Sequence, residues 1–351
     1  DLRVVGPVLA GHRSDGEVGP GEAMRIMTGA PLPAGADSVR KVEDVTLLDE
    51  GRRVRVPGGI RAGDNVRHPG EDVAVGDLIV ASGEVLGPAR LGVLASQGRS
   101  AVVAIARPRV GVLSTGNELS DSPDPLPRGM IRDSNRPTVL AALRQSGFGA
   151  VDLGRCGDQE AQIVDRLRDA VRTCDAVIST GGVSVGDVDF VKSALATISG
   201  DRARWMQIAV RPGKPFAFAT VGERETPIFG LPGNPVSTLV SFELLVRPAL
   251  RRLAGHPDLE RPVVAAVTDT DLARSPDGKL HVVHVTGAFA DDGKWHVRRA
   301  LRQGSHLLSA TAAANGLALV PDGHGVGPGG TVSVLLLDDI ASSVTTPWGA
   351  T

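Results

Sequence analysis

Residues 175–192, DAVISTGGVSVGDVDFVK, form the stretch that decides the fold of this chain. The stretch begins with three apolar residues at 176–178, which is typical of a buried strand in a parallel sheet. Gly181 and Gly182 follow this strand, and a backbone without side chains lets a ligand approach closely. An amphipathic pattern at 191–198 then predicts a helix. Strand, glycine loop and helix N-terminus together favour an anionic ligand, because free N–H groups and the helix dipole face it.

Polar side chains between the glycines and the helix indicate what accompanies that anion. Ser184 offers a hydroxyl, and Asp187 and Asp189 lie just before the helix. Two carboxylates beside an anion repel it unless a divalent cation bridges them. The stretch therefore predicts phosphate chemistry with Mg²⁺ held by Asp187 and Asp189, with helix capping as the alternative role of this pair.

The composition is that of a globular protein with several domains. A chain of 351 residues is too long for one compact core, so roughly two to four domains are expected. A net charge of −2 gives no strong attraction to nucleic acid or to a membrane surface. An aromatic content of 3 % argues against a stacking surface for single strands.

Cysteine usage and hydropathy indicate the compartment. The two cysteines, Cys156 and Cys174, form no CxxC pair, which favours reduced thiols. No apolar run approaches the roughly 18 residues needed to cross a bilayer. A secretory leader is also not visible. We therefore expect a cytoplasmic protein.

The first 106 residues are predicted to be rich in strands and turns. A β-rich domain is expected at 1–76, with strands at 4–8, 39–45 and 52–56. Residues 77–106 form a linking segment with a helix at 89–96 and a strand at 101–105. We expect this segment to belong to a domain that residues upstream of Asp1 complete.

Residues 107–257 alternate between strands and helices. Strands are predicted at 110–113, 151–153, 176–178, 208–210, 216–220 and 227–231. Helices are predicted after the cap at 133–135 and at 161–173, 191–198 and 238–253. Such units imply an α/β domain with a parallel sheet, helices on both faces and a ligand beyond the carboxyl ends of the strands. The loops TGNE, GGVS, RPGKP and LPGNP follow predicted strands, so they should meet at one rim.

The remaining residues return to β structure. Residues 258–340 are expected to form a small C-terminal β-barrel or sandwich, and 341–351 a disordered tail. Its strands are predicted at 263–268, 281–285, 297–300, 318–320 and 332–337.

Two carboxylates follow the ends of predicted strands. Glu118 ends the TGNE loop, where a cap or a salt-bridge partner is the alternative to a functional role. Asp158 precedes a helix, where capping and interaction with the helix dipole are the alternatives.

Two further loops suit an oxyanion. Arg211 and Lys214 bracket a stiff Pro-Gly turn, which suits a tetrahedral anion, with two surface cations as the alternative. Asn234 lies between two prolines and Ser237 opens a helix, which is typical of an anion-binding turn. No catalytic triad, zinc spacing or Walker A motif is present.

Seven motifs, in this order, identify a family that the chain resembles. They are RIMTGAPLPAGADSV, HPGEDVAVGD, STGNEL, GGVSVGDVDFVK, RPGKPFAF, LPGNPVSTLVSFE and RQGSHLLSATAAANGLALVP. Together they are similar to the molybdopterin molybdenumtransferase family, which includes bacterial MoeA and the E domain of animal gephyrin. The resemblance covers essentially the whole chain. It implies a MogA/MoaB-like α/β domain flanked by β-rich domains and a small C-terminal barrel.

The resemblance also implies an activity. Members of the family use Mg²⁺ to act on adenylylated molybdopterin, take molybdate, release AMP and leave molybdenum on the pterin dithiolene. An elongated homodimer with its cleft at the dimer interface is implied, with a MogA-type adenylyltransferase as a further partner. Molybdate is a tetrahedral dianion that needs fixed donors and cations, and Mg²⁺ can stabilise an adenylate leaving group.

Matching positions imply the site residues. Catalytic roles fall on Glu118, Asp158 and Asp189, and on Asp72, an acid that reaches the cleft from the partner subunit. The substrate-binding set is Thr115, Gly116, Gly181, Gly182, Ser184, Arg211, Lys214, Pro215, Asn234, Ser237 and Ser305.

Several positions depart from the family pattern. Asn117 replaces the Asp of TGDE, and Gln207 and Arg211 stand where one branch of the family has lysines. His284 stands at a small-domain arginine that meets molybdate, and a histidine is charged only when protonated. The family's Asp-Gly-Tyr-Ala motif would lie upstream of Asp1. Besides an active transferase, four interpretations stay open: a catalytically impaired paralogue, a tungstate-handling paralogue, a non-enzymatic, gephyrin-like scaffold, and an unrelated phosphate-binding α/β enzyme.

Overall fold

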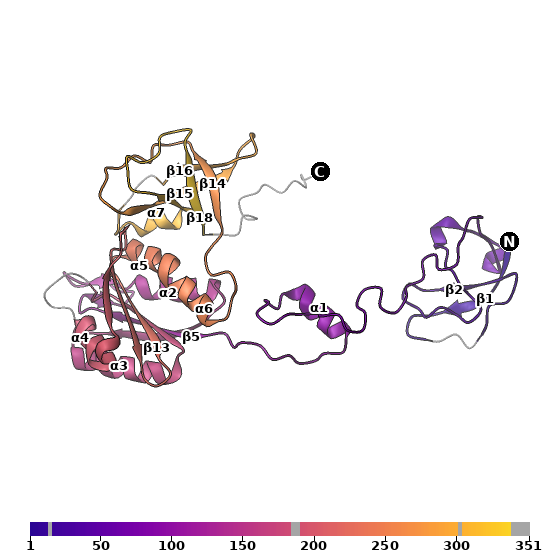
Figure 1. Cartoon of the computed structure of the whole chain (residues 1–351), viewed down its shortest axis with the longest axis horizontal. Coiled ribbons are helices and arrows are strands. Elements are labelled where there is room, and N and C mark those ends of the chain that lie inside the picture. The colour runs from indigo at the N-terminus through magenta and orange to yellow at the C-terminus, as the bar shows by residue number, and fades with distance from the viewer. Residues whose placement is uncertain (13–15, 184–189, 301–303, 338–351) are drawn as a thin grey trace. The chain divides into compact units, whose positions relative to one another are not determined.

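The structure is a computed structural model that describes residues 1–12, 16–183, 190–300 and 304–337. The chain divides into two compact units (Figure 1), one of residues 1–81 with 86–99, the other of residues 82–85 with 100–351. In the described ranges, no helix is both long and apolar enough to cross a membrane. The predicted tail at 341–351 lies outside these ranges. Cys156 and Cys174 are unpaired and buried, which confirms the expectation of free thiols.

The first unit is built on a four-stranded sheet. Its strand order is β2 (Glu22–Ile26), β1 (Leu2–Val8), β4 (Arg53–Arg55) and β3 (Thr46–Leu48). The pair β1–β2 is parallel and the other two pairs are antiparallel. Short 3-10 turns at Val42–Asp44 and Asp49–Gly51 flank β3, and helix α1 (Pro88–Ser96) begins with a proline in its first turn.

Two strand predictions in this part of the chain are wrong. Residues 39–45 contain a 3-10 turn, because Val39, Val42 and Val45 recur every third residue rather than every second. Residues 101–105 have no regular structure and are exposed. An apolar run becomes a strand only where another strand pairs with it, and the sequence of the run does not supply that partner.

The α/β part of the second unit has a mixed six-stranded sheet. Its strand order is β10 (Arg204–Gln207), β12 (Pro215–Val221), β13 (Thr226–Leu231), β9 (Ala176–Thr180), β5 (Arg109–Thr115) and β8 (Gly149–Cys156). The strands from β13 to β8 are parallel, as predicted, but β12 is antiparallel to both of its neighbours. The all-parallel prediction is wrong at this edge because residues 222–225 join β12 to β13, and so short a turn permits only an antiparallel return.

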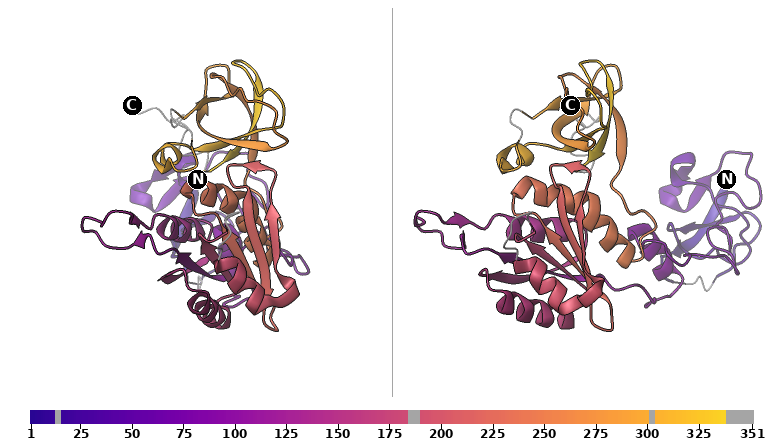
Figure 2. Two further views of the ribbon diagram at one scale, coloured as in Figure 1. Left: turned by 90° about the vertical axis from the view of Figure 1, so that its left-hand side faces the viewer. Right: turned by 60° about the vertical axis from the view of Figure 1, so that its left-hand side comes forward.

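Helices cover both faces of this sheet (Figures 1 and 2). One face carries α3 (Glu160–Thr173) and α4 (Phe190–Ser199). The other carries α2 (Asn135–Gln145), α5 (Pro235–Ser241), a π-helical segment (Phe242–Val246) and α6 (Arg247–Leu253). Alternate strand residues serve the two cores: Val177 faces the first, whereas Ala176 and Ile178 face the second.

The predicted helix at 238–253 begins earlier and is not regular throughout. It starts at Pro235, and the π-helical segment interrupts it before α6. Pro248, in the first turn of α6, has no N–H to donate to a carbonyl in the preceding turn, so the helical ladder is broken there. A small two-stranded ribbon pairs β6 (Leu119–Ser120) with β7 (Ile131–Arg132), and it precedes α2 in the sequence.

The last part of the second unit is a closed barrel of five strands, as predicted (Figure 2). Around the ring the strands are β15 (Leu280–Phe289), β16 (Trp295–Arg299), β14 (Val263–Thr268), β18 (Thr331–Leu336) and β17 (Gly316–Val320). β17 pairs back with β15 and closes the ring. Helix α7 (Leu308–Ala312) precedes β17, and the short strand β11 (Val210–Arg211) joins β15 from the α/β part.

A buried ion pair fastens the π-helical segment to the chain that leads into the barrel. The carboxylate of Glu243 accepts hydrogen bonds from Nε (2.6 Å) and Nη2 (3.0 Å) of Arg261, whose Nη1 donates to the carbonyl of Leu337 (2.7 Å). The two side chains are 6 % and 12 % exposed. Neither charge could therefore be fully rehydrated if the other were removed.

We expect Glu243→Ala to lower the free energy of unfolding by about 3 kcal/mol, because it leaves the Arg261 charge buried without a partner. Denaturant unfolding followed by tryptophan fluorescence measures this loss. Asp169→Ala is the matched control, since it removes an ion pair with Arg172 in which the side chains are 76 % and 77 % exposed. Its cost should stay below about 0.5 kcal/mol. Equal losses at the two positions would contradict the importance of burial.

Candidate active site

The loops predicted to bind the ligand meet at one edge of the mixed sheet. β5, β9 and β13 end side by side, with Thr180 opposite both Ser114 and Leu231. The N–H of Gly181 donates to the carbonyl of Leu231 (3.1 Å). The TGNE, GGVS and LPGNP loops therefore meet at the carboxyl ends of their strands, as the sequence predicts.

The RPGKP loop reaches the same edge by another route. β10 and β12 form a hairpin in which Gln207 lies opposite Pro215, and the loop is the turn of that hairpin. The loop thus precedes an antiparallel strand that leaves the rim, which the prediction of a parallel strand did not foresee. The peptide bond between Arg211 and Pro212 is cis.

Glycine is required where the GGVS loop crosses Thr115. Gly181 has φ +90°, and a Cβ there would lie 2.5 Å from the carbonyl oxygen of Thr115. Gly182 has φ +64°, and a Cβ there would lie 2.4 Å from the side chain of Val191. Thr115 is itself buried, and its hydroxyl donates to the carbonyl of Thr180 (3.3 Å). At these two positions the loop is held close to the sheet and carries no side chain of its own, which lets a ligand approach its main chain.

The carboxylates Glu118 and Asp158 lie in two loops that hydrogen bonds hold together. The N–H of Asn117 donates to Oδ2 of Asp158 (3.0 Å), and the N–H of Asp158 donates to Oδ1 of Asn117 (3.2 Å). Glu118 is exposed, and a Cβ at Gly116 would lie 2.5 Å from its Oε2, so its carboxylate lies directly over that glycine. Asp158 makes no helix cap, because its carboxylate is bonded to the TGNE loop instead.

The structure does not bring the remaining predicted catalytic and metal-binding residues to this pair of loops among the residues that it describes. Ser184, Asp187 and Asp189 lie outside the described residues. Asp72 is exposed and belongs to the first unit, whereas Glu118 belongs to the second. Within residues 1–12, 16–183, 190–300 and 304–337, no group of three or more His, Cys, Asp or Glu is arranged to hold a metal ion.

The predicted oxyanion residues line one cavity of about 840 Å³ in the second unit. They come from the RPGKP loop, the LPGNP loop and the barrel: Arg211, Lys214, Pro215, Asn234, Ser237 and Ser305. Two main-chain contacts fix this meeting: the N–H of Val236 donates to the carbonyl of Ser305 (3.1 Å), and β11 pairs with β15. Residues far apart in the sequence are thus brought to one cavity.

The charges of the cavity differ from one side chain to the next. Lys214 is exposed, and its ammonium makes no ion pair or hydrogen bond with any described residue. Arg211 is 69 % exposed and lies 3.8 Å from a carboxylate oxygen of Asp277. His284 is 4 % exposed, and burial lowers the pKa of its imidazole to about 4, so it is neutral at pH 7. Gln207 is not among the residues that line the cavity.

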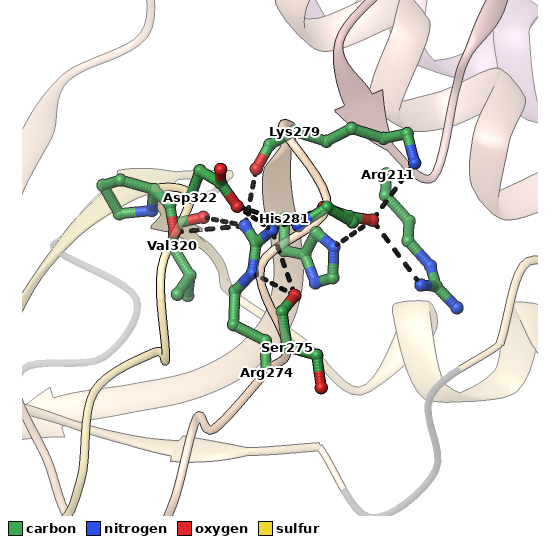
Figure 3. A network of polar contacts seen from close by, with 9 residues as sticks. Arg211, Arg274, Ser275, Lys279, His281, Val320 and Asp322 are labelled. Carbon is green, nitrogen blue, oxygen red and sulfur yellow. Dashed lines mark hydrogen bonds and ion pairs between the residues drawn. The ribbon is translucent and has the colours of Figure 1, made fainter.

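Several lining residues were not predicted from the sequence. Arg274, Asp277 and His281 come from the start of β15 and the turn before it, and Arg299 and His306 follow later in the chain. Figure 3 shows the network of polar contacts that contains Arg274 and His281 together with Arg211, Lys279 and Asp322. Asp277 is hydrogen-bonded to both Arg274 and His281. The signal that could have found them is the charged, turn-forming run RSPDGKLH at 274–281, which precedes an apolar strand pattern.

Three family profiles match the chain in the order of its parts. The MoeA N-terminal region (domain I and II) matches residues 2–98, a probable molybdopterin binding domain matches residues 111–252, and the MoeA C-terminal region (domain IV) matches residues 266–337.

Known proteins of similar sequence and structure agree with these matches. Molybdopterin molybdenumtransferase of Haemophilus influenzae is 37 % identical over 335 residues, which are 95 % of this chain and 81 % of the relative. Molybdopterin molybdenumtransferase 2 of Mycobacterium tuberculosis is 37 % identical over 331 residues, which are 92 % and 78 % of the two chains. The crystal structure of a MoeA protein from Pyrococcus horikoshii has a TM-score of 0.74 at 26 % identity, covering 95 % of this chain and 80 % of its own.

The fold and these matches define the protein as a transferase of molybdenum cofactor biosynthesis. The chain belongs to the molybdopterin molybdenumtransferase family, as its seven motifs imply.

Gly181→Ala should cost about 3 kcal/mol of unfolding free energy, because it combines an unfavourable left-handed φ with a clash against the Thr115 carbonyl. Thermal or denaturant unfolding measures this cost. Gly222→Ala is the matched control: its φ is +74°, but a Cβ there would meet nothing within 4 Å. The control should cost only about 1 kcal/mol. If both variants lost the same amount, close contact with Thr115 would not be the reason for glycine at 181.

Acid should destabilise the protein in part through His284. Its pKa is lowered from 6.5 to about 4 in the folded protein, so from pH 6.5 to 4 the unfolded chain binds a proton that the folded protein excludes. The free energy of unfolding therefore falls over this range, by about 2–3 kcal/mol from this group. Denaturant unfolding at pH 7 and pH 4.5 of the wild type and His284→Gln measures the difference. Identical pH dependences in the two proteins would contradict this assignment.

Proposed function

We propose that this chain inserts molybdate into adenylylated molybdopterin in an Mg²⁺-dependent reaction that yields molybdenum cofactor and AMP. The strongest support for this proposal is that one loop, LPGNP, contributes to two places. It lies beside Gly181 and Gly182 at the sheet edge, which we call the glycine rim, and it lines the cavity of about 840 Å³, which we call the anion cavity. A Cβ at Gly233 would lie 3.8 Å from the Cα of Gly181, and the next residue, Asn234, lines the cavity. A phosphate-bearing ligand at the rim would therefore lie beside an oxyanion in the cavity, as group transfer between them requires.

In this proposal the rim binds the pterin and its phosphates. The main chain of Gly181 and Gly182 admits the ligand closely, and Ser184 adds a hydroxyl beyond it. Thr115 and Gly116 form the opposite side of the rim, where Thr115 is buried. The contacts of these residues with the sheet preorganise the rim before any ligand binds.

The cavity binds molybdate through side chains of different charge. Lys214 and Arg211 supply the positive charge, Ser237, Asn234 and Ser305 supply hydrogen bonds, and Pro215 stiffens the turn. His284, neutral at pH 7, contributes an imidazole hydrogen-bonding group in place of a charge. The oxyanion is therefore held by two exposed cations and neutral hydrogen-bonding groups.

The donors at the rim are of the kind that Mg²⁺ prefers, which are carboxylate oxygens with phosphate oxygens completing the shell. Glu118 presents an exposed carboxylate over Gly116, and the carboxylate of Asp158 is fixed by Asn117. With Asp187 and Asp189 from the GGVS loop, these acids would hold the ion. When bound, Mg²⁺ supplies positive charge that stabilises the departing adenylate.

The assembly belongs to the same proposal. We propose a homodimer in which Asp72 of one copy reaches the cleft of the other, and the exposure of Asp72 supports this role. A MogA-type adenylyltransferase would supply the adenylylated pterin, in the cytoplasm. We expect the cavity to accept tungstate as well as molybdate, because both are tetrahedral dianions.

The direct test is AMP release from adenylylated molybdopterin by the purified protein. Release should require both Mg²⁺ and molybdate, and tungstate should compete with molybdate. If no AMP is released when adenylylated molybdopterin, Mg²⁺ and molybdate are all present, the transferase activity is rejected and an impaired paralogue or a scaffold is favoured. Release that continues without Mg²⁺ would reject the metal assignment alone.

Lys214→Ala should raise the molybdate concentration for half-maximal AMP release by about tenfold, because it removes a charge-assisted hydrogen bond to the oxyanion. Lys294→Ala is the matched control, since Lys294 is 66 % exposed on the barrel and is paired at 3.9 Å with Asp292. The control should leave the molybdate requirement unchanged. An unchanged requirement in Lys214→Ala as well would place the oxyanion elsewhere.

A further inference from the structure

The wall that the barrel contributes to the anion cavity contains a carboxylate, Asp277. A fixed negative charge in a cavity that binds a dianion is unexpected, because like charges repel over several ångströms. Asp277 is not isolated, however: Lys279 and His281 hydrogen-bond to its side chain, and Arg211 lies 3.8 Å away. Its carboxylate is 24 % exposed, so it is open to the cavity on one side and enclosed on the other.

One oxygen of Asp277 is anchored to the barrel. Nη2 of Arg274 donates to its Oδ1 (2.5 Å) and to Oδ1 of Asp322 (2.8 Å). The Arg274 side chain is 3 % exposed, and its Nη1 also donates to the carbonyls of Lys279 (2.5 Å) and Pro321 (3.1 Å). The position of Asp277 is therefore set by a buried, well-bonded arginine.

The other oxygen has three partners, of which Arg211 and His281 line the cavity. Oδ2 accepts hydrogen bonds from Nζ of Lys279 (3.1 Å) and Nε2 of His281 (3.2 Å), and lies 3.8 Å from Nη1 of Arg211. The hydrogen bond from His281, followed by that from Lys279, holds the pKa of Asp277 well below its usual range, against an opposing effect of desolvation. Asp277 is therefore ionised at neutral pH.

The contact with Arg211 is the weakest of the set. At 3.8 Å it is longer than a hydrogen bond, and the Arg211 side chain is 69 % exposed. The strand pairing fixes only its main chain, with Arg211 opposite His281. An exposed pair of this kind is worth little, so its guanidinium can exchange a carboxylate oxygen for an oxyanion oxygen at small cost.

We propose that Asp277 is an internal counter-ion of the anion cavity, which competes with the entering oxyanion for Arg211 and His281 and so determines the charge preference of the site. This counter-ion role rests on the proposed function in one respect only, which is that the cavity binds a tetrahedral oxyanion. By repelling a dianion about twice as strongly as a monoanion, Asp277 limits the affinity for molybdate and keeps its binding reversible.

The experiment compares two tetrahedral oxyanions of similar shape, molybdate with two negative charges and perrhenate with one. Calorimetry on the full chain measures their affinities for the wild type and Asp277→Asn. The asparagine keeps the shape and an oxygen acceptor for Arg274. We expect Asp277→Asn to bind molybdate about tenfold and perrhenate about threefold more tightly, with both gains shrinking as salt is added.

Three variants separate this role from a structural one. Asp322 is the other carboxylate bonded to Arg274, and Asp322 does not line the cavity. Asp322→Asn should therefore leave the ratio of the two affinities unchanged. Asp277→Glu keeps the charge and should restore the wild-type ratio. Lys279→Met removes one donor from Asp277, so its charge is less neutralised and molybdate should weaken more than perrhenate. The last two variants also test the proposal if Asp277→Asn does not fold.

The outcomes distinguish this inference from the proposed function. A wild type that binds molybdate, with Asp277→Asn binding it equally or more weakly, would overturn the counter-ion role and leave the transferase proposal intact. Binding of molybdate by neither protein would overturn both the role and the oxyanion cavity. A uniform gain for the two anions would also overturn it, because the effect must grow with the charge of the ligand.

Discussion

The pairing of β11 with β15 is the constraint on which the anion cavity depends. β16 pairs with β15 only at residues 285–289, which leaves the first residues of β15 open along that edge. β11 pairs with Leu280 and His281 there, and the N–H of Leu280 donates to the carbonyl of Ala209 (2.8 Å). An open strand edge is a strong site for main-chain pairing. The RPGKP loop begins at this pairing, so its cations face the side chains of the barrel.

The charges of the site are divided between its two halves. The rim has acids, Glu118 and Asp158, beside uncovered glycine main chain, whereas the cavity has the cations Arg211 and Lys214. In the proposed function, a metal ion would bind at the first arrangement and an oxyanion at the second. Asp277 is the exception to this division, and its partners account for its presence among cations.

The parts of the fold that local pattern determines were predictable from the sequence. Apolar periodicity gave the strands that line the buried core and both layers of helices, and glycine after a strand gave the rim. Where the pairing of strands rather than the local pattern determines the structure, the sequence was not sufficient to predict it. The reversed direction of β12 follows from a short turn, and the exposed run at 101–105 has strand-like composition without a strand.

The candidate site shows the same limit. Sequence pattern suggested Arg211, Lys214, Asn234 and Ser237, because each lies in a stiff loop after a strand, but Ser305 came only from the family resemblance. The charged run at 274–281 marks Asp277 as a turn residue, but its place in the cavity could not be predicted, since it comes from β15 meeting β11 across about 70 residues of chain. The bonding of Asp158 to Asn117 was likewise hidden, because a carboxylate before a helix is ordinarily a cap.

The edge that β11 covers has a consequence for how the barrel behaves on its own. In the intact chain the open part of β15 is occupied by a strand of the same molecule, so it offers no template to a neighbour. A detached barrel of residues 258–337 would expose that edge of β15 to solvent, beside the apolar residues Leu280 and Leu317 at the starts of β15 and β17. Strand exchange between copies would then be favoured, so the α/β part protects the barrel from self-association as well as lining a cavity together with it.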